Sequence, residues 1–97
     1  MPIKVIIEMQ AQPGRRDDLK RLLDDLVATR GTDRRGFIGS TRYEVLDDPD
    51  LLVEMADWDS VEARMEHLEE AMATNAFGPL TELMAAPFRV TVVRALE

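Results

Sequence analysis

The sequence predicts a single α+β domain in which two β-α-β units form a four-stranded antiparallel sheet. Three observations predict it. Alternating apolar and polar stretches are separated by stretches with helical spacing, in the order β-α-β-β-α-β. A turn-forming segment divides this order into two halves of similar length. The 97 residues suffice for one domain, which we expect to span residues 1–97.

The first half is expected to hold a strand, a helix and a second strand. Residues 3–10 alternate, and Pro13-Gly14 ends this strand. Residues 15–30 form a helix that stops at Gly31. Its apolar stripe consists of Leu19, Leu22, Leu23, Leu26 and Val27. Residues 36–46 form the second strand. We expect Phe37, Thr41, Tyr43 and Val45 on one of its faces, and Ile38, Ser40, Arg42, Glu44 and Leu46 on the other.

The second half repeats the pattern. Residues 47–50, Asp-Asp-Pro-Asp, predict a turn, and they lack the spacing and glycine of a calcium loop. Residues 51–58 form the third strand, and Ser60 caps a helix. The predicted apolar face of that helix is Val61, Met65, Leu68 and Met72. A short helical segment at residues 77–84 and a fourth strand at residues 88–96 complete a ferredoxin-like fold with both helices on one sheet face.

Composition excludes several function classes. The net charge of −7 disfavours a nucleic-acid partner, because neutralising phosphates supplies most of that affinity. The chain has no cysteine and one histidine, so we expect no thiolate or multi-histidine metal site. There is neither a signal-peptide pattern nor an apolar run of membrane-spanning length. We therefore expect a soluble cytoplasmic protein with no membrane partner.

The sheet face away from the helices is predicted to mix apolar and charged residues. By alternation it carries Lys4, Ile6, Glu8, Ile38, Arg42, Glu44, Leu52, Glu54, Ala56, Trp58, Arg89, Thr91 and Val93. The glutamates can pair with Arg42 and Arg89 across strands. So much apolar surface predicts a homodimer in which two sheets pack face to face. The alternative is an exposed face with scattered apolar residues.

Several motifs carry a resemblance that covers nearly the whole chain. They are Pro13-Gly14, the strand end Val53-Glu54-Met55-Ala56-Asp57-Trp58, the cap Asp59-Ser60, His67 nine residues after the tryptophan, and Asn75-Ala76-Phe77. In these motifs the chain resembles the antibiotic biosynthesis monooxygenase family of dimeric α/β barrels. The resemblance implies a dimer with a pocket between helices and sheet in each subunit.

The resemblance also implies an activity class. Characterised family members include oxygenases that use no metal or flavin and oxidise quinols or aromatic polyketides, and haem-degrading enzymes. The haem-degrading members combine a first-strand Asn with a Trp and a His; this chain matches Trp58 and His67 but has Ile7 on the first strand. The polyketide oxygenases carry an Asn four residues before the Trp and a Tyr six residues after it. Those positions are Glu54 and Arg64 here.

Three residues are candidates for catalysis. A cofactor-free oxygenase must deprotonate its substrate in a dry pocket. His67 is the candidate base, because imidazole titrates near neutral pH, although it is equally placed to be a surface histidine. Trp58 either orients an aromatic substrate or plugs the end of its strand. Tyr43 either donates a hydrogen bond into the pocket or packs at its rim. The predicted phases place Trp58 on the dimer side of the sheet and His67 on the helix side, which leaves open whether the two share a pocket.

Two functions from different classes remain open. In the first, the chain is a cofactor-independent monooxygenase that oxidises a small quinol, phenolic or polyketide-like aromatic substrate with O2, with His67 as base and Trp58 and Tyr43 shaping the pocket. In the second, it is a non-catalytic dimeric domain that binds a small ligand or is associated with stress. A pocket too narrow for an aromatic ring, or one filled by methionine side chains, would favour the second.

Overall fold

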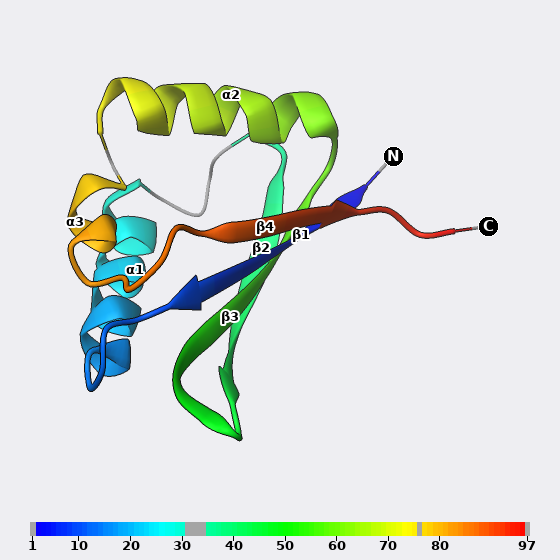
Figure 1. Ribbon diagram of the computed structural model, residues 1–97. Helices are drawn as coiled ribbons and strands as arrows, with labels where there is room; N and C mark the ends of the chain where they lie inside the picture. The colour runs from blue at the N-terminus through cyan, green and yellow to red at the C-terminus, as the bar shows by residue number, and fades with distance from the viewer. Residues whose placement is uncertain (1, 31–34, 76, 97) are drawn as a thin grey trace.

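The computed structural model of the protein describes residues 2–30, 35–75 and 77–96. Its elements follow in the order β1 (Ile3–Gln10), α1 (Arg16–Arg30), β2 (Phe37–Val45), β3 (Asp48–Trp58), α2 (Val61–Ala73), α3 (Gly78–Thr81) and β4 (Arg89–Val93). The four strands form one sheet in the order β2-β3-β1-β4, and each neighbouring pair is antiparallel (Figure 1). The predicted ferredoxin-like α+β fold is therefore confirmed.

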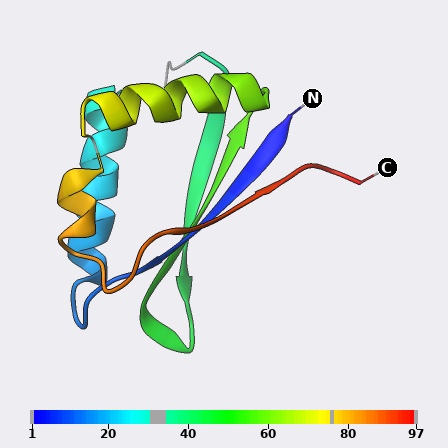
Figure 2. The ribbon, with the colours of Figure 1, turned by 45° about the horizontal axis from the view of Figure 1, so that its top comes forward.

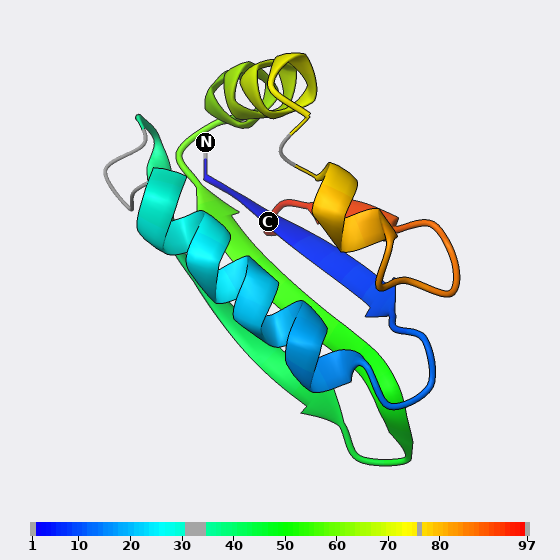
Figure 3. The same ribbon diagram turned by 90° about the vertical axis from the view of Figure 1, so that its left-hand side faces the viewer.

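The helices lie on one side of the sheet. α1 and α3 stand next to each other over its middle, and α2 crosses above the end at which β3 finishes (Figure 2). Figure 3 shows α1 in front of β2 and β3, with α3 nearer to β1. No helix in the described part of the chain is long and apolar enough to cross a membrane.

The turns largely follow the local sequence signals. The predicted acidic turn is a tight hairpin at residues 46–47, and β3 already begins at Asp48. The Asp48 carboxylate accepts a hydrogen bond from the backbone N–H of Asp50 at 3.1 Å, and the Asp50 carboxylate accepts one from the N–H of Gly14 at 3.0 Å. Both bonds satisfy backbone donors near chain turns. The predicted helix stop at Gly31, the loop residues 32–34 and the side chain of Val27 lie outside the described residues.

The N-terminus of α2 is fixed to the start of β2. Ser60 caps the helix as predicted, because its hydroxyl accepts a hydrogen bond from the N–H of Ala63 at 3.2 Å. One residue earlier, the N–H of Asp59 donates to the carbonyl of Gly36 at 2.7 Å. Gly36 has a φ of +84°, and a Cβ at this position would collide with the Cβ of Ala63. Glycine is therefore required where β2 passes beneath α2.

Two separate apolar clusters form the core. The larger cluster joins α1, α3 and the middle of the sheet; its buried members are Met9, Ala11, Leu19, Leu23, Leu52, Leu80, Leu83 and Met84. The smaller cluster lies near the start of α2 and consists of Ile3, Val5, Ala56 and Trp58. Ile7 packs against both clusters, so the region around it lies between two cores.

The predicted sheet faces are right for β1 and β4 but wrong for β3 and for most of β2. Residues directly opposite each other in antiparallel strands share a face. The register pairs Val5 with Ala56 and Ile7 with Glu54, so the even-numbered residues of β3 face the helices. Arg42 pairs with Glu54 and therefore faces the helices as well. The predicted cross-strand pair of these two residues is confirmed, but on the opposite face.

Two physical causes explain this correction. Both faces of β3 are apolar, since Leu51, Val53 and Met55 alternate with Leu52 and Ala56, and alternation alone does not distinguish them. In β2 the register shifts between Phe37 and Gly39. Such a bulge moves every following side chain to the other face.

The outer face of the sheet therefore has a different composition from the predicted one. Tyr43 lies there, opposite Val53, and Thr41 lies opposite Met55. Met55 in turn pairs with Ile6 on β1. The face mixes apolar residues with polar ones, among them Lys4 and Asp57, which form an ion pair at 3.4 Å, and within the described chain no helix covers it (Figure 1).

Candidate functional site

A pocket lies between the helices and the sheet, at the junction of the two apolar clusters. Its cavity volume is about 210 Å³. Its walls come from all four strands, from α1, α2 and α3, and from residues just before α3 and β4. They comprise Val5, Ile7, Met9, Leu23, Leu26, Phe37, Ser40, Arg42, Glu54, Ala56, Trp58, Arg64, His67, Leu68, Phe77, Leu80, Phe88 and Val90. The pocket is mostly apolar, with a few polar groups at defined places, as is typical of sites for small organic ligands.

The floor of the pocket is one continuous row across the sheet. Val90 of β4 pairs with Ile7 of β1, Ile7 pairs with Glu54 of β3, and Glu54 pairs with Arg42 of β2. All four side chains line the pocket. The row runs from apolar at the β4 edge to charged at the β2 edge, so the floor gives a ligand one apolar end and one polar end.

Trp58 and His67 meet in this pocket, contrary to the prediction that they lie on different sides of the sheet. Their ring centroids are 5.2 Å apart and the rings are tilted by 35°. The ring of Phe37 packs edge-on against Trp58, also with a centroid distance of 5.2 Å. Trp58 is buried, and both partners hold its ring in one orientation. An imidazole is thus placed next to a rigid aromatic surface in an apolar cavity.

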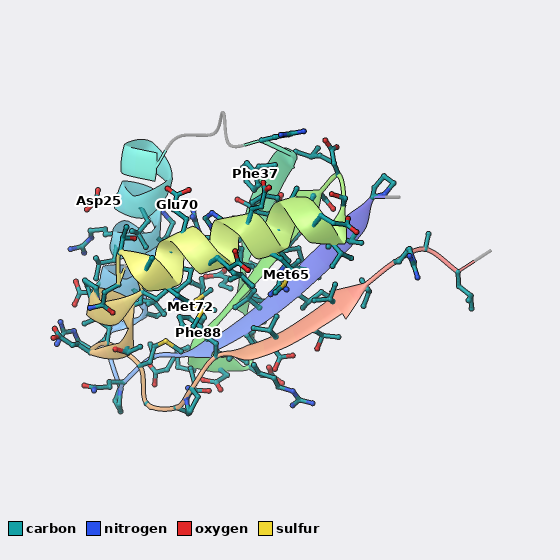
Figure 4. The ribbon with its side chains drawn as sticks, turned by 90° about the horizontal axis from the view of Figure 1, so that it is seen from above. Asp25, Phe37, Met65, Glu70, Met72 and Phe88 are labelled. Atoms are coloured by element: carbon teal, nitrogen blue, oxygen red, sulfur yellow. The ribbon has the colours of Figure 1, made fainter. Side chains whose placement is uncertain are left out.

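The face of α2 that looks into the pocket is not the predicted apolar stripe. Met65 is 45% exposed and Met72 is 75% exposed. In Figure 4 both lie along the side of the helix that is turned toward β4. The inward residues are Arg64, His67, Leu68 and the fully buried Ala71, which recur at helical spacing. The helix is rotated by about one residue from the predicted phase, and this rotation brings Arg64 and His67 to the pocket wall.

Arg42 joins the sheet to α1 through two carboxylates. Its Nε donates to Glu54 Oε2 at 3.2 Å, and its Nη1 donates to Asp24 Oδ1 at 2.6 Å. The third nitrogen, Nη2, is buried and has no hydrogen-bond partner among the described residues. Desolvation raises the pKa of the Glu54 carboxyl, and the charge and hydrogen bond of Arg42 only partly oppose this increase. The polar end of the pocket floor is therefore a desolvated ion pair.

Arg64 differs from Arg42 in having no counter-charge. Burial lowers the pKa of its guanidinium, and within the described chain it forms no ion pair and no side-chain hydrogen bond. It lies three residues before His67, so the two side chains are neighbours on one helical face. Glu54 and Arg64 are also the two positions at which the sequence departs from the polyketide-oxygenase pattern. The structure brings both to the same pocket.

Tyr43 does not reach the pocket, so the expectation that it donates a hydrogen bond there is wrong for this chain. It is 48% exposed on the outer face of the sheet, opposite Val53, because the β2 bulge reverses its direction. The sequence interpretation also missed Ser40, Arg42, Glu54 and Arg64 as pocket residues. A signal for two of them was present, since the expected Arg42–Glu54 pair required both to share one face.

The arrangement supports proton transfer in a largely apolar pocket. An imidazole lies beside an indole and within a largely apolar wall, which favours binding of a flat aromatic ligand. Apolar walls also strengthen the electrostatic interactions within the site. Among the described residues, no group of three or more His, Cys, Asp or Glu side chains could hold a metal ion.

Solved structures share this architecture over nearly the full chain. Rv0793 from Mycobacterium tuberculosis is 31% identical, with a TM-score of 0.80 over 100% of this chain and 97% of that one. A protein from Bordetella bronchiseptica, described as a putative antibiotic biosynthesis monooxygenase, is 21% identical, with a TM-score of 0.83 over 99% and 98% of the two chains. The N63A mutant of SnoaB, a cofactor-independent oxygenase from Streptomyces nogalater, is 14% identical, with a TM-score of 0.83 over 99% and 94%. The last two similarities concern the fold alone.

The comparison of sequences leads to a family. No curated protein matches the chain. The sequence model of the family described as antibiotic biosynthesis monooxygenase matches residues 2–78, which include β1 to α2 and all the pocket-lining residues named above except Leu80, Phe88 and Val90. Because this match covers most of the chain and the full-length fold agrees with it, the chain belongs to the antibiotic biosynthesis monooxygenase family.

Proposed function

We propose that this protein is a cofactor-independent monooxygenase that oxidises a small quinol or phenol with O2. The observation that carries the proposal is the contact between His67 and Trp58 on the wall of an apolar pocket. Trp58 provides a flat surface for the substrate ring, and His67 accepts the proton of its hydroxyl. Family membership supports a monooxygenase-type reaction in general terms.

The substrate supplies all the electrons in this reaction. A phenol deprotonated by His67 becomes an electron-rich phenolate that can reduce O2 directly. For a phenol with a free ring C–H position, one oxygen atom enters the ring and the product is a quinone. The other oxygen atom leaves as water with the two hydrogens that the substrate loses. The protein's tasks are to take up the proton, to orient the ring and to keep water away.

The size of the pocket narrows the substrate class. A cavity of about 150 Å³ with apolar walls accommodates benzene. The pocket here, at about 210 Å³, suits a ring system of one or two rings better than a three- or four-ring polyketide. Among the described methionines only Met9 lines it, so methionine side chains do not fill the space. The non-catalytic alternative would be favoured by a pocket too narrow for an aromatic ring or filled by methionine side chains, and the described residues meet neither condition.

Oxygen uptake tests the proposal. Purified protein should consume O2 with at least one member of a panel of one- and two-ring quinols and phenols. His67→Phe keeps a ring against Trp58 but removes the base, and we expect kcat to fall about 100-fold or more. Met65→Leu, on the outward side of α2, and Tyr43→Phe, on the outer sheet face, should leave kcat within about twofold, because general acid–base losses need a group that reaches the substrate. No uptake with the whole panel, or an unchanged rate in His67→Phe, would refute the proposal.

We also propose that the protein is a homodimer that forms through the outer face of the sheet. This face carries Ile6, Val53 and Met55 from two central strands, and the described helices leave it uncovered. Light scattering at micromolar concentration should give twice the mass of the chain. A clean monomer under these conditions would contradict this part of the proposal.

A further inference from the structure

The charges on the pocket wall are not balanced. Arg42, Glu54, Arg64 and His67 are the ionisable side chains that line the pocket. Arg42 forms an ion pair with Glu54 at 3.2 Å, so the two charges on the sheet side of the pocket compensate each other; Arg42 also binds Asp24 of α1, which does not line the pocket, at 2.6 Å. On the α2 side, Arg64 has no carboxylate partner among the described residues. The uncompensated positive charge on the pocket wall is thus that of Arg64 on α2.

An uncompensated guanidinium at an apolar wall favours an anionic ligand. Arginine remains protonated at neutral pH, and its fork of N–H donors matches the oxygens of an anion. Burial already lowers the pKa of Arg64, which shows that its positive charge is poorly solvated here. An anion that enters the pocket replaces part of this lost solvation, whereas a neutral ligand does not.

The position of Arg64 also determines which part of a ligand it contacts. Arg64 precedes His67 by three residues on the inward face of α2, and the His67 ring lies against Trp58. A ring placed on Trp58 therefore presents its substituent along this helical face. Because the charges of Glu54 and Arg42 compensate each other at the floor, the ionised end is directed toward the guanidinium of Arg64 on α2.

We propose that Arg64 is the anion-binding residue of this pocket, and that its ligands are one- or two-ring aromatic molecules bound through an ionised oxygen on the ring. This inference deepens the proposed function, since it names the ionisation state in which a phenolic substrate is bound. As a statement about binding, it does not require turnover. Arg64 holds the phenolate that results when His67 or solvent takes the proton.

Binding of a coloured phenol tests the inference directly. The probe is 4-nitrophenol, whose phenolate is yellow, and 4-nitroanisole is its neutral counterpart of nearly equal shape. Trp58, the only tryptophan in the chain, reports binding of either compound through its fluorescence. Wild-type protein should bind 4-nitrophenol at least tenfold more tightly than 4-nitroanisole at a pH where the free phenol is half ionised. The bound phenol should be more ionised than the free one.

Variants separate charge from shape. Arg64→Met should weaken binding of 4-nitrophenol at least tenfold and change binding of 4-nitroanisole less than twofold. Arg64→Lys keeps the charge and should retain most of the preference for the anion. Arg21→Met removes the same charge from an exposed site on α1, away from the pocket, and should match the wild type. Thermal unfolding of each variant verifies that it is folded.

Three outcomes of these binding measurements would overturn the inference. The inference is overturned if 4-nitrophenol does not bind, if the wild type shows no preference for the anion, or if Arg64→Met binds the two probes as the wild type does. Anion binding that depends on Arg64, together with no oxygen uptake from any phenol, would overturn the monooxygenase and leave the binding site. Oxygen uptake by the wild type, together with an unchanged KM in Arg64→Met, would overturn the anion-binding role of Arg64 and leave the monooxygenase proposal standing.

Discussion

The guanidinium of Arg42 holds together two carboxylates on different elements, and Arg42→Met removes it while keeping an unbranched apolar stem. Its partners are Glu54 on β3 and Asp24 on α1. The side chain of Glu54 is 14% exposed, whereas that of Asp24 is 46% exposed. The two halves of the interaction therefore contribute unequally to stability.

The expected loss follows from this difference in burial. Removing one partner of a buried ion pair costs about 3–5 kcal/mol, and the remaining accessibility of Glu54 favours the low end, about 3 kcal/mol. The exposed bond to Asp24 adds roughly 0.5 kcal/mol. Removing the buried Nη2, which has no partner within the described chain, offsets about 1 kcal/mol of this destabilisation. The net destabilisation is about 2–3 kcal/mol, which lowers Tm by roughly 10–20 °C in a domain of this size.

Urea unfolding at pH 7 measures this loss, and a double variant tests its cause. In Arg42→Met/Glu54→Met no buried carboxylate remains without a partner, so we expect a free energy of unfolding within about 1 kcal/mol of the wild type. A loss below about 1 kcal/mol for Arg42→Met, or a double variant no more stable than the single one, would refute the view that Glu54 is buried and held in its charged form by Arg42.

The pH dependence of Arg42→Met provides a second test of the same reasoning. Desolvation raises the pKa of Glu54 and Arg42 opposes the increase, so the variant should raise this pKa further. When the pKa of a carboxyl is raised in the folded protein, ionisation of that carboxyl lowers the free energy of unfolding. That penalty disappears as the pH falls through the folded pKa toward 4.5, the ordinary pKa of a glutamate side chain. The loss caused by Arg42→Met should therefore shrink with decreasing pH, and a loss that stays constant to pH 4.5 would contradict it.

Three further substitutions probe the neighbouring structure. Because the pKa of Glu54 is raised in the folded protein, the contribution of Glu54 to the stability of the wild type decreases as the pH rises above 4.5. The difference in unfolding free energy between the wild type and Glu54→Gln should therefore fall over this range by at most about 1.4 kcal/mol per pH unit in urea titrations. A difference that rises with pH would contradict this expectation. Gly36→Ala adds strain at positive φ and a collision with Ala63, and it should cost roughly 2–4 kcal/mol in thermal unfolding, whereas Gly39→Ala meets nothing within 4 Å and serves as the tolerated control. Ser60→Ala removes the cap of α2 and should cost about 1 kcal/mol by urea unfolding; no loss would show that the cap bond contributes nothing.

The order of elements could be predicted from the sequence because each element has its own local signals. Pro13-Gly14 ends the first strand, Ser60 caps the second helix, and residues 47–50 lie at the hairpin. These signals depend on backbone conformation at single positions, which the residue type largely determines. Strand pairing then follows from the order of the elements and the antiparallel rule, so the topology is recovered without knowledge of any side-chain contact.

The faces of β2 and β3 could not be predicted in the same way. A strand with apolar residues on both sides gives no alternation to read, and Leu51 to Ala56 is such a segment. The phase of β2 depends on one extra residue between Phe37 and Gly39, for which a glycine in the strand is the only local signal. Apart from Phe37, the pocket residues on these two strands were therefore assigned to the wrong face, although the residue types had been noticed.

The errors on the sheet and on α2 share one feature, which is that they lie around the pocket. Periodicity arguments assume that apolar residues point inward and charged residues point outward. Around the pocket the pattern is reversed: Arg42, Glu54 and Arg64 point inward, while Met55 on the sheet and Met65 on α2 point outward. A fold that only had to be stable would gain by the opposite arrangement, because desolvating charged groups is costly. The cost is understandable if the inward charges serve a ligand and the outward apolar residues on the sheet serve a partner subunit. The positions at which the hydrophobic pattern fails are therefore the best guide in this chain to where it functions.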